Sequence, residues 1–262
     1  MFGHQVLKHS ADRGIQVVAE LPGERPSGLG WLADGRLLVV AMKQRALLRL
    51  EADGGLSVHA DLRDWCRGFP NDMVVAADGT AYVGDSGLPE FGQPGQRQPG
   101  QLLRVAPNGG VSVAADDLVV PNGCVVTDDG RRMLLVEAHA GRIVSFAVGT
   151  DGSLSERRLF AEVPAARPGE HVHPDGMCLD TDGAVWVCDV AGRRVLRILT
   201  DGSIDDDIAF HTRTPVACVL GGPDRRTLYI CASGGGGADI LEHTTAGTII
   251  STRVAVPGAG RP

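Results

Sequence analysis

Three oxygen-bearing side chains recur at the same place in successive stretches of this sequence. Asn71, Asn122 and Asp175 each follow a proline and precede a short apolar run. Amide and carboxylate oxygens suit Ca²⁺ or Mg²⁺ and, less selectively, Mn²⁺ or Zn²⁺. A divalent ion held by them could polarise an ester carbonyl or activate a water molecule. Asn and Asp also cap tight turns that lead into strands, so a purely structural role stays open.

Each of these side chains opens a stretch that is typical of a β-hairpin, with two short apolar strands around an Asp-Gly turn. A second turn follows each first one, so every repeat of roughly 40–50 residues predicts the four strands of one propeller blade. Nothing of helical length shows a period of 3.6 residues. We therefore expect an all-β propeller with almost no helix, whose repeats begin at Pro26, Pro70, Pro121, Pro174 and Pro215.

The start of the chain differs from these five repeats. Residues 5–7 and 15–21 resemble the last two strands of another blade whose first two strands are missing. A six-bladed propeller with an incomplete N-terminal blade is preferred to a five-bladed ring with an extra hairpin. Residues 1–262 are then one domain. An incomplete blade exposes strand edges, which a second chain could close as a homodimer.

Composition narrows the class of partner. The formal net charge is −7 and the pI is near 5.6, with no run of Lys or Arg, which argues against nucleic acid. No apolar run is long enough for a signal peptide or a membrane span. We expect a cytoplasmic protein with a small-molecule substrate and no membrane partner. The six cysteines lack C-x-x-C spacing, and Cys124, Cys178 and Cys218 fall within first strands, where small buried residues are expected.

Strand direction sorts the connections of such a propeller onto two faces. The tight Asp-Gly turns fall on one face, and the long connections, such as 85–100 and 161–174, fall on the other. Asn71, Asn122 and Asp175 open innermost strands on this second face, next to the central channel. Long loops on one face of a rigid scaffold are where binding usually occurs.

Five ordered motifs together resemble the blade signatures of one known family. The sequence is similar to the gluconolactonase, senescence-marker-protein and luciferin-regenerating-enzyme family over nearly its whole length. This resemblance implies a six-bladed propeller with one divalent metal ion, usually calcium, and lactone hydrolysis, while relatives of the same architecture cleave organophosphates. The motifs are Asn71-Asp72, Pro121-Asn122-Gly123, Pro174-Asp175-Gly176-Met177-Cys178-Leu179-Asp180, Trp186-Val187 and Ala217-Cys218-Val219-Leu220-Gly221-Gly222.

The resemblance also implies roles for individual residues. Asn122 is similar to a metal ligand, and Asp175 is similar to the ligand that also serves as the general base. Asn71 is similar to a residue that faces the substrate. We add His173, which with His171 flanks Asp175, as a residue that could donate to the substrate or take a proton near neutral pH.

One family feature is missing here. Members supply a glutamate ligand from the first blade, in a Glu-Gly-Pro stretch that this sequence lacks. Glu24 lies near that register, in a loop between blades. Glu137 and His139 are candidates to take its place, although an exposed glutamate at the rim is the commoner explanation. Asp85 and Asp189 occupy equivalent positions and share that explanation.

The leading hypothesis is a metal-dependent hydrolase of a lactone or related cyclic ester, with Asp175 as general base. Calcium is the first choice of metal, with Mg²⁺, Mn²⁺ and Zn²⁺ as alternatives. A propeller that lost one ligand and only binds a small molecule is the alternative from another class. A phosphotriesterase-like hydrolase at the same site is the third. No Gly-x-Ser-x-Gly motif supports a serine hydrolase.

Overall fold

The chain is built almost entirely of β-strands. The computed structural model describes residues 3–10, 12–89, 95–234 and 247–260. Within these ranges the single helical element is a 3-10 turn, η1 (Ala138–Ala140), that follows a strand end. The expectation of an all-β chain with almost no helix is confirmed. No helix among the described residues is both long and apolar enough to cross a membrane.

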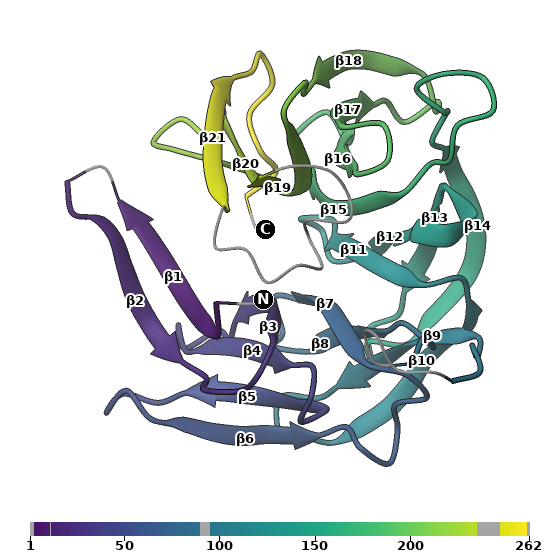
Figure 1. Cartoon of the computed structure of the whole chain (residues 1–262). Coiled ribbons are helices and arrows are strands. Elements are labelled where there is room, and N and C mark those ends of the chain that lie inside the picture. Colours follow the sequence, from purple (N-terminus) through teal and green to yellow (C-terminus); the bar gives the residue numbers. More distant parts are fainter. Residues whose placement is uncertain (1–2, 11, 90–94, 235–246, 261–262) are drawn as a thin grey trace. The chain divides into compact units, whose positions relative to one another are not determined.

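The chain divides into two compact units, 1–117 and 118–262. In the first unit a two-stranded hairpin precedes two four-stranded antiparallel sheets with their strands in chain order (Figure 1). The strands are β1 (Gln5–Ser10) and β2 (Gly14–Glu20), then β3 (Pro26–Trp31), β4 (Leu37–Ala41), β5 (Ala46–Leu50) and β6 (Leu56–Asp61), then β7 (Pro70–Val75), β8 (Ala81–Asp85), β9 (Gly100–Val105) and β10 (Val111–Leu118).

The described part of the second unit forms two further four-stranded sheets and one of three strands. They consist of β11 (Pro121–Val126), β12 (Arg132–Glu137), β13 (Arg142–Val148) and β14 (Leu154–Glu162), then β15 (Pro174–Leu179), β16 (Val185–Asp189), β17 (Arg194–Ile198) and β18 (Ile204–Ala209), then β19 (Arg213–Gly221), β20 (Thr227–Gly234) and β21 (Thr248–Arg253).

The last sheet differs from the expected four strands. β21 pairs directly with β20, so the strand expected as the fourth of this repeat takes the third place among the described residues. The segment in which another strand was expected, 235–246, lies outside the described residues. Among the described residues there are five sheets of three or four strands. A sixth, incomplete blade and a single domain over 1–262 stay predictions.

The Asp-Gly turns form as the sequence predicts. Gly35, Gly79, Gly130 and Gly183 all have positive φ, which glycine adopts without a steric penalty. In most of these turns the Asp side chain accepts a hydrogen bond from the backbone two residues on, as Asp34 does from the amide of Arg36. The turns therefore fix the pairing of each first strand with its second.

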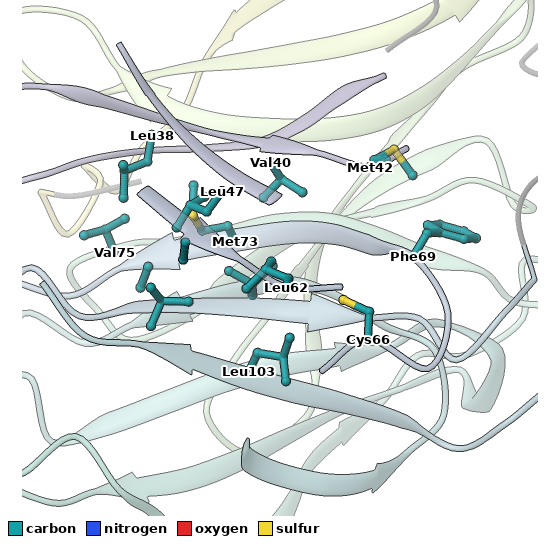
Figure 2. Packing of buried hydrophobic residues seen from close by; sticks show 14 residues of the cluster. Leu38, Val40, Met42, Leu47, Leu62, Cys66, Phe69, Met73, Val75 and Leu103 are labelled. Carbon is teal, nitrogen blue, oxygen red and sulfur yellow. The ribbon is translucent and has the colours of Figure 1, made fainter. Parts of the chain in front are cut away.

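Apolar side chains between neighbouring sheets form the core. In the first unit, residues of the β3–β6 sheet pack against residues of the β7–β10 sheet (Figure 2). Leu38 and Leu47 come from one sheet, and Met73 and Leu103 come from the other. A second cluster joins Val6 and other hairpin residues to the opposite face of β4 and β5. Each Å² of apolar surface buried in such contacts stabilises the fold by about 25 cal/mol.

Candidate active site

The predicted site residues lie in a bulge that recurs in the first strand of each sheet. Pro121 pairs with Glu137 and Cys124 pairs with Leu135, so Asn122 and Gly123 together face one residue of β12. The ladder shifts in the same way after Pro26, Pro70 and Pro174, and by one residue after Pro215. A bulge frees a residue from ladder pairing and re-aims its side chain.

The second residue of the bulge, a glycine in β11, lets the first strands of neighbouring sheets approach closely. A Cβ atom on Gly123 would lie 2.6 Å from the carbonyl oxygen of Asp175 and 2.8 Å from the amide nitrogen of Met177. Such distances do not occur for real side chains, so only glycine fits between β11 and β15. Asn122 and Asp175 therefore occupy equivalent positions on two strands in direct contact.

Asn122 and Asp175 both carry side-chain oxygen atoms of the type that bind hard cations, but the set is small. Asn122 is 6% exposed, and its Oδ1 atom accepts a hydrogen bond from the amide of Gly123 at 2.8 Å. That oxygen has a second lone pair. Asp175 is half-buried. Within the described ranges no cluster of three or more His, Cys, Asp or Glu residues could hold a metal ion. The pair suits a hard cation in chemical type and provides one carboxylate.

Asn71 occupies the corresponding bulge of β7, in the first unit. Its carbonyl oxygen accepts a hydrogen bond from the hydroxyl of Ser27, which stands at the same position of β3, at 2.8 Å. The next residue, Asp72, replaces the glycine found at this position in β3, β11 and β15. Asp72 is half-buried by surface exposure, and desolvation raises its pKa to about 6. Sequence reasoning gave Asp72 no role, and this break in the repeat was the available signal.

His173 lies beside a second histidine from the neighbouring sheet. The rings of His173 and His139 meet edge to face with their centroids 5.1 Å apart. The amide of His173 donates to Asp189 at 3.2 Å, which fixes the backbone two residues before Asp175. Burial lowers the pKa of His173, which favours the neutral form of its imidazole. His171 is exposed. The pairing of His139 with His173 was not predicted.

The acids that end the second strands have a structural role, and the interpretation of them as exposed rim residues was wrong. Asp85, Glu137 and Asp189 are 0% exposed. Asp85 accepts hydrogen bonds from the amides of Arg67 and Gly68, and Glu137 accepts one from the amide of Val119. Each carboxylate ties down the segment that leads into the first strand of its sheet, because buried amides need an acceptor.

The carboxylate of Glu137 is occupied by two arginine side chains as well as by a backbone amide. Glu137 forms ion pairs with Arg142 at 2.7 Å and Arg157 at 2.6 Å. Burial raises its pKa, but the two arginines and the amide of Val119 outweigh burial and hold the pKa below its ordinary value. A carboxylate with this many donors does not replace the missing glutamate ligand.

The carboxylate of Glu24 is also occupied by hydrogen-bond donors from the protein. Its carboxylate accepts hydrogen bonds from the amides of Arg25, Lys43 and Gln44 at 2.6 Å, 2.7 Å and 2.9 Å. These contacts hold the turn after β4. Glu24 therefore organises a connection between sheets, as its loop position in the sequence suggested.

Consecutive antiparallel sheets with strands in chain order, each opening on a bulged first strand, define a β-propeller. Solved structures agree. A calcium-binding protein, regucalcin, from Agrobacterium tumefaciens aligns over 99% of this chain and 85% of its own, with a TM-score of 0.79 and 20% identity. A gluconolactonase from Xanthomonas campestris aligns over 90% of this chain and 77% of its own, with a TM-score of 0.72 and 27% identity.

The sequence comparison gives the family. The chain belongs to the SMP-30/gluconolactonase/LRE-like family, whose profile matches residues 1–234, so the resemblance found in the motifs is confirmed. A 6-deoxy-6-sulfogluconolactonase from Pseudomonas putida is 33% identical over 172 residues, which are 65% of this chain and 58% of that protein. A pentonolactonase from Haloferax volcanii is 28% identical over 236 residues, 87% of this chain and 76% of that protein. The chain thus spans less than two thirds of the Pseudomonas relative.

Proposed function

We propose that this protein is a divalent-metal-dependent hydrolase of a sugar lactone or related cyclic ester. Family membership and two relatives named as lactonases support this reaction class. The observation that carries the proposal is the contact of β11 with β15 at Gly123, which sets Asn122 and Asp175 side by side in matching bulges. An amide and a carboxylate so placed can act on one bound molecule.

The residues of the chain divide the work between them. Asn122 and Asp175 would hold the cation, with calcium the first choice. When bound, the cation supplies polarisation of the ester carbonyl. Asp175 accepts the proton of the attacking water through an oxygen that is not engaged with the cation, because only a free lone pair can act as a base.

His173 contributes at the mouth of the site. Because burial favours the neutral form of the His173 imidazole, this ring can hydrogen-bond a neutral hydroxyl group without charging. Pairing it with a carboxylate would require two charges to be desolvated, which costs more free energy. With the His139 ring against it, His173 has a restricted orientation. These features favour a substrate that carries hydroxyl groups on its ring, as lactones of sugar acids do.

Turnover of a lactone panel tests this proposal. Purified protein is assayed with D-glucono-1,5-lactone, a pentono-1,4-lactone and unsubstituted δ-valerolactone, each with Ca²⁺, Mg²⁺, Mn²⁺ or Zn²⁺ and with chelator. We expect metal-stimulated hydrolysis of the sugar lactones. Asp175→Ala should lower kcat by about 10²–10⁴-fold because it removes the base. Asp182→Asn, in the exposed turn of the same sheet, is the matched control and should leave kcat unchanged.

Two results would contradict the assignment. Ligand-induced thermal stabilisation without turnover under any metal would identify a binding propeller instead. Hydrolysis that persists in Asp175→Ala would show that the chemistry lies elsewhere. A phosphotriester substrate added to the panel separates the third candidate, since it uses the same site with a different leaving group.

A further inference from the structure

A group of buried thiols lies where two sheets of the second unit meet. Cys178 belongs to β15 and Cys218 to β19, and their Sγ atoms are 3.9 Å apart. The Cys218 thiol also lies 3.2 Å from the carbonyl oxygen of Trp186, to which it donates. A third thiol, that of Cys188 on β16, is near enough to raise the pKa of Cys218. Cys178 and Cys218 are 40 residues apart in sequence and belong to different sheets.

The backbone holds these two sulfur atoms near each other. A Cβ atom on Gly176 would lie 2.8 Å from the Cα atom of Ala217, so β15 and β19 are in direct contact next to the cysteines. Cys178 is 3% exposed and Cys218 is 7% exposed. A disulfide needs two Cβ atoms roughly 3.5–4.5 Å apart and sulfurs about 2 Å apart. Thiols already within 4 Å reach this geometry chiefly by side-chain rotation.

We propose that Cys178 and Cys218 are an oxidation site at which a small peroxide forms a disulfide between the β15 and β19 sheets. One sulfur attacks the peroxide, whose O–O bond breaks as an S–O bond forms and a molecule of water leaves. The second sulfur then displaces the oxygen, forming the S–S bond and releasing a second water. In total, two thiols and one hydrogen peroxide give one disulfide and two waters.

The surroundings of the two cysteines set the rate of this reaction. Burial raises the pKa of Cys178. The pKa of Cys218 is also raised: the bond with Cys178 lowers it, and the nearby Cys188 and burial outweigh that effect. Because the thiolate is the reactive form, the disulfide forms slowly, after oxidation of the exposed Cys231.

The disulfide would lie close to the candidate active site. Cys178 follows Asp175 by three residues in the same strand, and the Asp175 carboxylate is near enough to raise the pKa of Cys188, after the larger effect of burial. A covalent link at Cys178 therefore restrains the strand that carries Asp175. The disulfide itself does not depend on the proposed hydrolase function.

Peptide mapping tests the site directly. The intact protein is treated with hydrogen peroxide, alkylated without reduction, and digested with trypsin and chymotrypsin. Cleavage after Trp186 separates Cys178 from Cys188, so the two candidate partners of Cys218 are distinguished. We expect a linked pair of peptides that contains Cys178 and Cys218, has lost the mass of two hydrogen atoms, and separates after reduction. No linked pair after complete oxidation of Cys231, or a link from Cys188 to Cys218, would overturn the proposal.

Variants and stability give an independent measurement. Cys178→Ala and Cys218→Ser should each abolish the linked pair, whereas Cys66→Ala, a buried thiol in the first unit, should retain it. Closing a loop of 40 residues should raise Tm in the oxidised wild type by about 5–10 °C, with reversal by reductant. An equal rise in Cys178→Ala would assign the stabilisation to another thiol and contradict the proposal.

Discussion

Carboxylates at the same end of neighbouring strands have different roles in this protein. Glu137 and Asp189 end their strands fully buried and satisfied by amides and arginines. Asp175 lies one strand away, in a bulge that removes it from ladder pairing. The sequence showed that these acids lie at one end of the strands. It did not show which are satisfied, because their amide and arginine partners come from segments far away in sequence.

Glu137→Gln should destabilise the protein by about 3 kcal/mol at pH 7, since it leaves Arg142 and Arg157 without their buried carboxylate. The folded-state pKa of Glu137 is lowered, so its contribution is complete above the unfolded-state pKa and is lost as pH falls through the folded-state pKa. Urea unfolding at pH 7 and pH 3 measures this. The control Glu170→Gln, whose pair with Arg167 is exposed, should cost under about 0.5 kcal/mol. Equal costs in both variants would refute the structural role of Glu137.

Asp72→Asn should stabilise the protein at pH 8 by about 1–3 kcal/mol. Desolvation raises the pKa of Asp72 to about 6, so wild-type stability is complete below the unfolded-state pKa near 4 and declines as pH rises through about 6. The variant lacks this decline. Thermal unfolding at pH 4.5 and pH 8 should therefore show a larger Tm gain at the higher pH. The exposed Asp64→Asn is the control, and a gain independent of pH would contradict burial as the cause.

At the scale of elements, the strands and turns followed from local signals and the bulges did not. Asp-Gly pairs and alternating apolar residues are read within a few positions, and Gly35 and Gly79 have the positive φ that such turns need. The bulges arise from the pairing of a first strand with its second, together with the contact to the next sheet. Gly123 belongs to one of the family motifs, but the reason that it must be glycine is its contact with Asp175, which the sequence alone does not show.

Gly123→Ala should destabilise the protein strongly, by about 3 kcal/mol or more, because its Cβ would lie 2.6 Å from the oxygen of Asp175. The matched control is Gly130→Ala in the same unit, where φ is +68° and nothing lies within 4 Å of the added atom. That variant should cost about 1 kcal/mol from its backbone conformation alone. Chemical denaturation of both variants makes the comparison. A smaller cost for Gly123→Ala than for Gly130→Ala would show that β11 and β15 are not in close contact.

At the scale of the molecule, the repeat pattern predicted the sheets and their order. Pro26, Pro70, Pro121 and Pro174 each open a sheet, and Pro215 is the third residue of β19. The strands within each sheet are neighbours in sequence. The pattern did not predict the last sheet, in which β21 pairs directly with β20. The segment 235–246, where another strand was expected between them, lies outside the described residues. The metal and the missing glutamate were also beyond the pattern, since a ligand set depends on side chains from separate repeats.

Calcium should raise the global Tm by about 3–5 °C at ten times its Kd, because a ligand that binds the folded state stabilises it by about 1.4 kcal/mol at that concentration. With one carboxylate in the Asn122 and Asp175 pair, we expect Kd in the millimolar range. Scanning calorimetry with 0–20 mM Ca²⁺, on the order of the concentrations weak sites require, measures the shift. The increment should vanish in Asp175→Asn and persist in Asp182→Asn. Persistence in Asp175→Asn would place the cation elsewhere.

The bulge at the start of each first strand separates chemistry from architecture. Ser27, Asn71, Asn122, Asp175 and Val216 all occupy it, and none contributes to the ladder that holds its sheet together. Point substitutions at these five positions can therefore change which ligand the protein binds while the strands stay in register. The side chains at these five positions are a hydroxyl, two amides, one acid and one hydrocarbon. The position therefore accepts different chemistry in each sheet without a change in strand pairing.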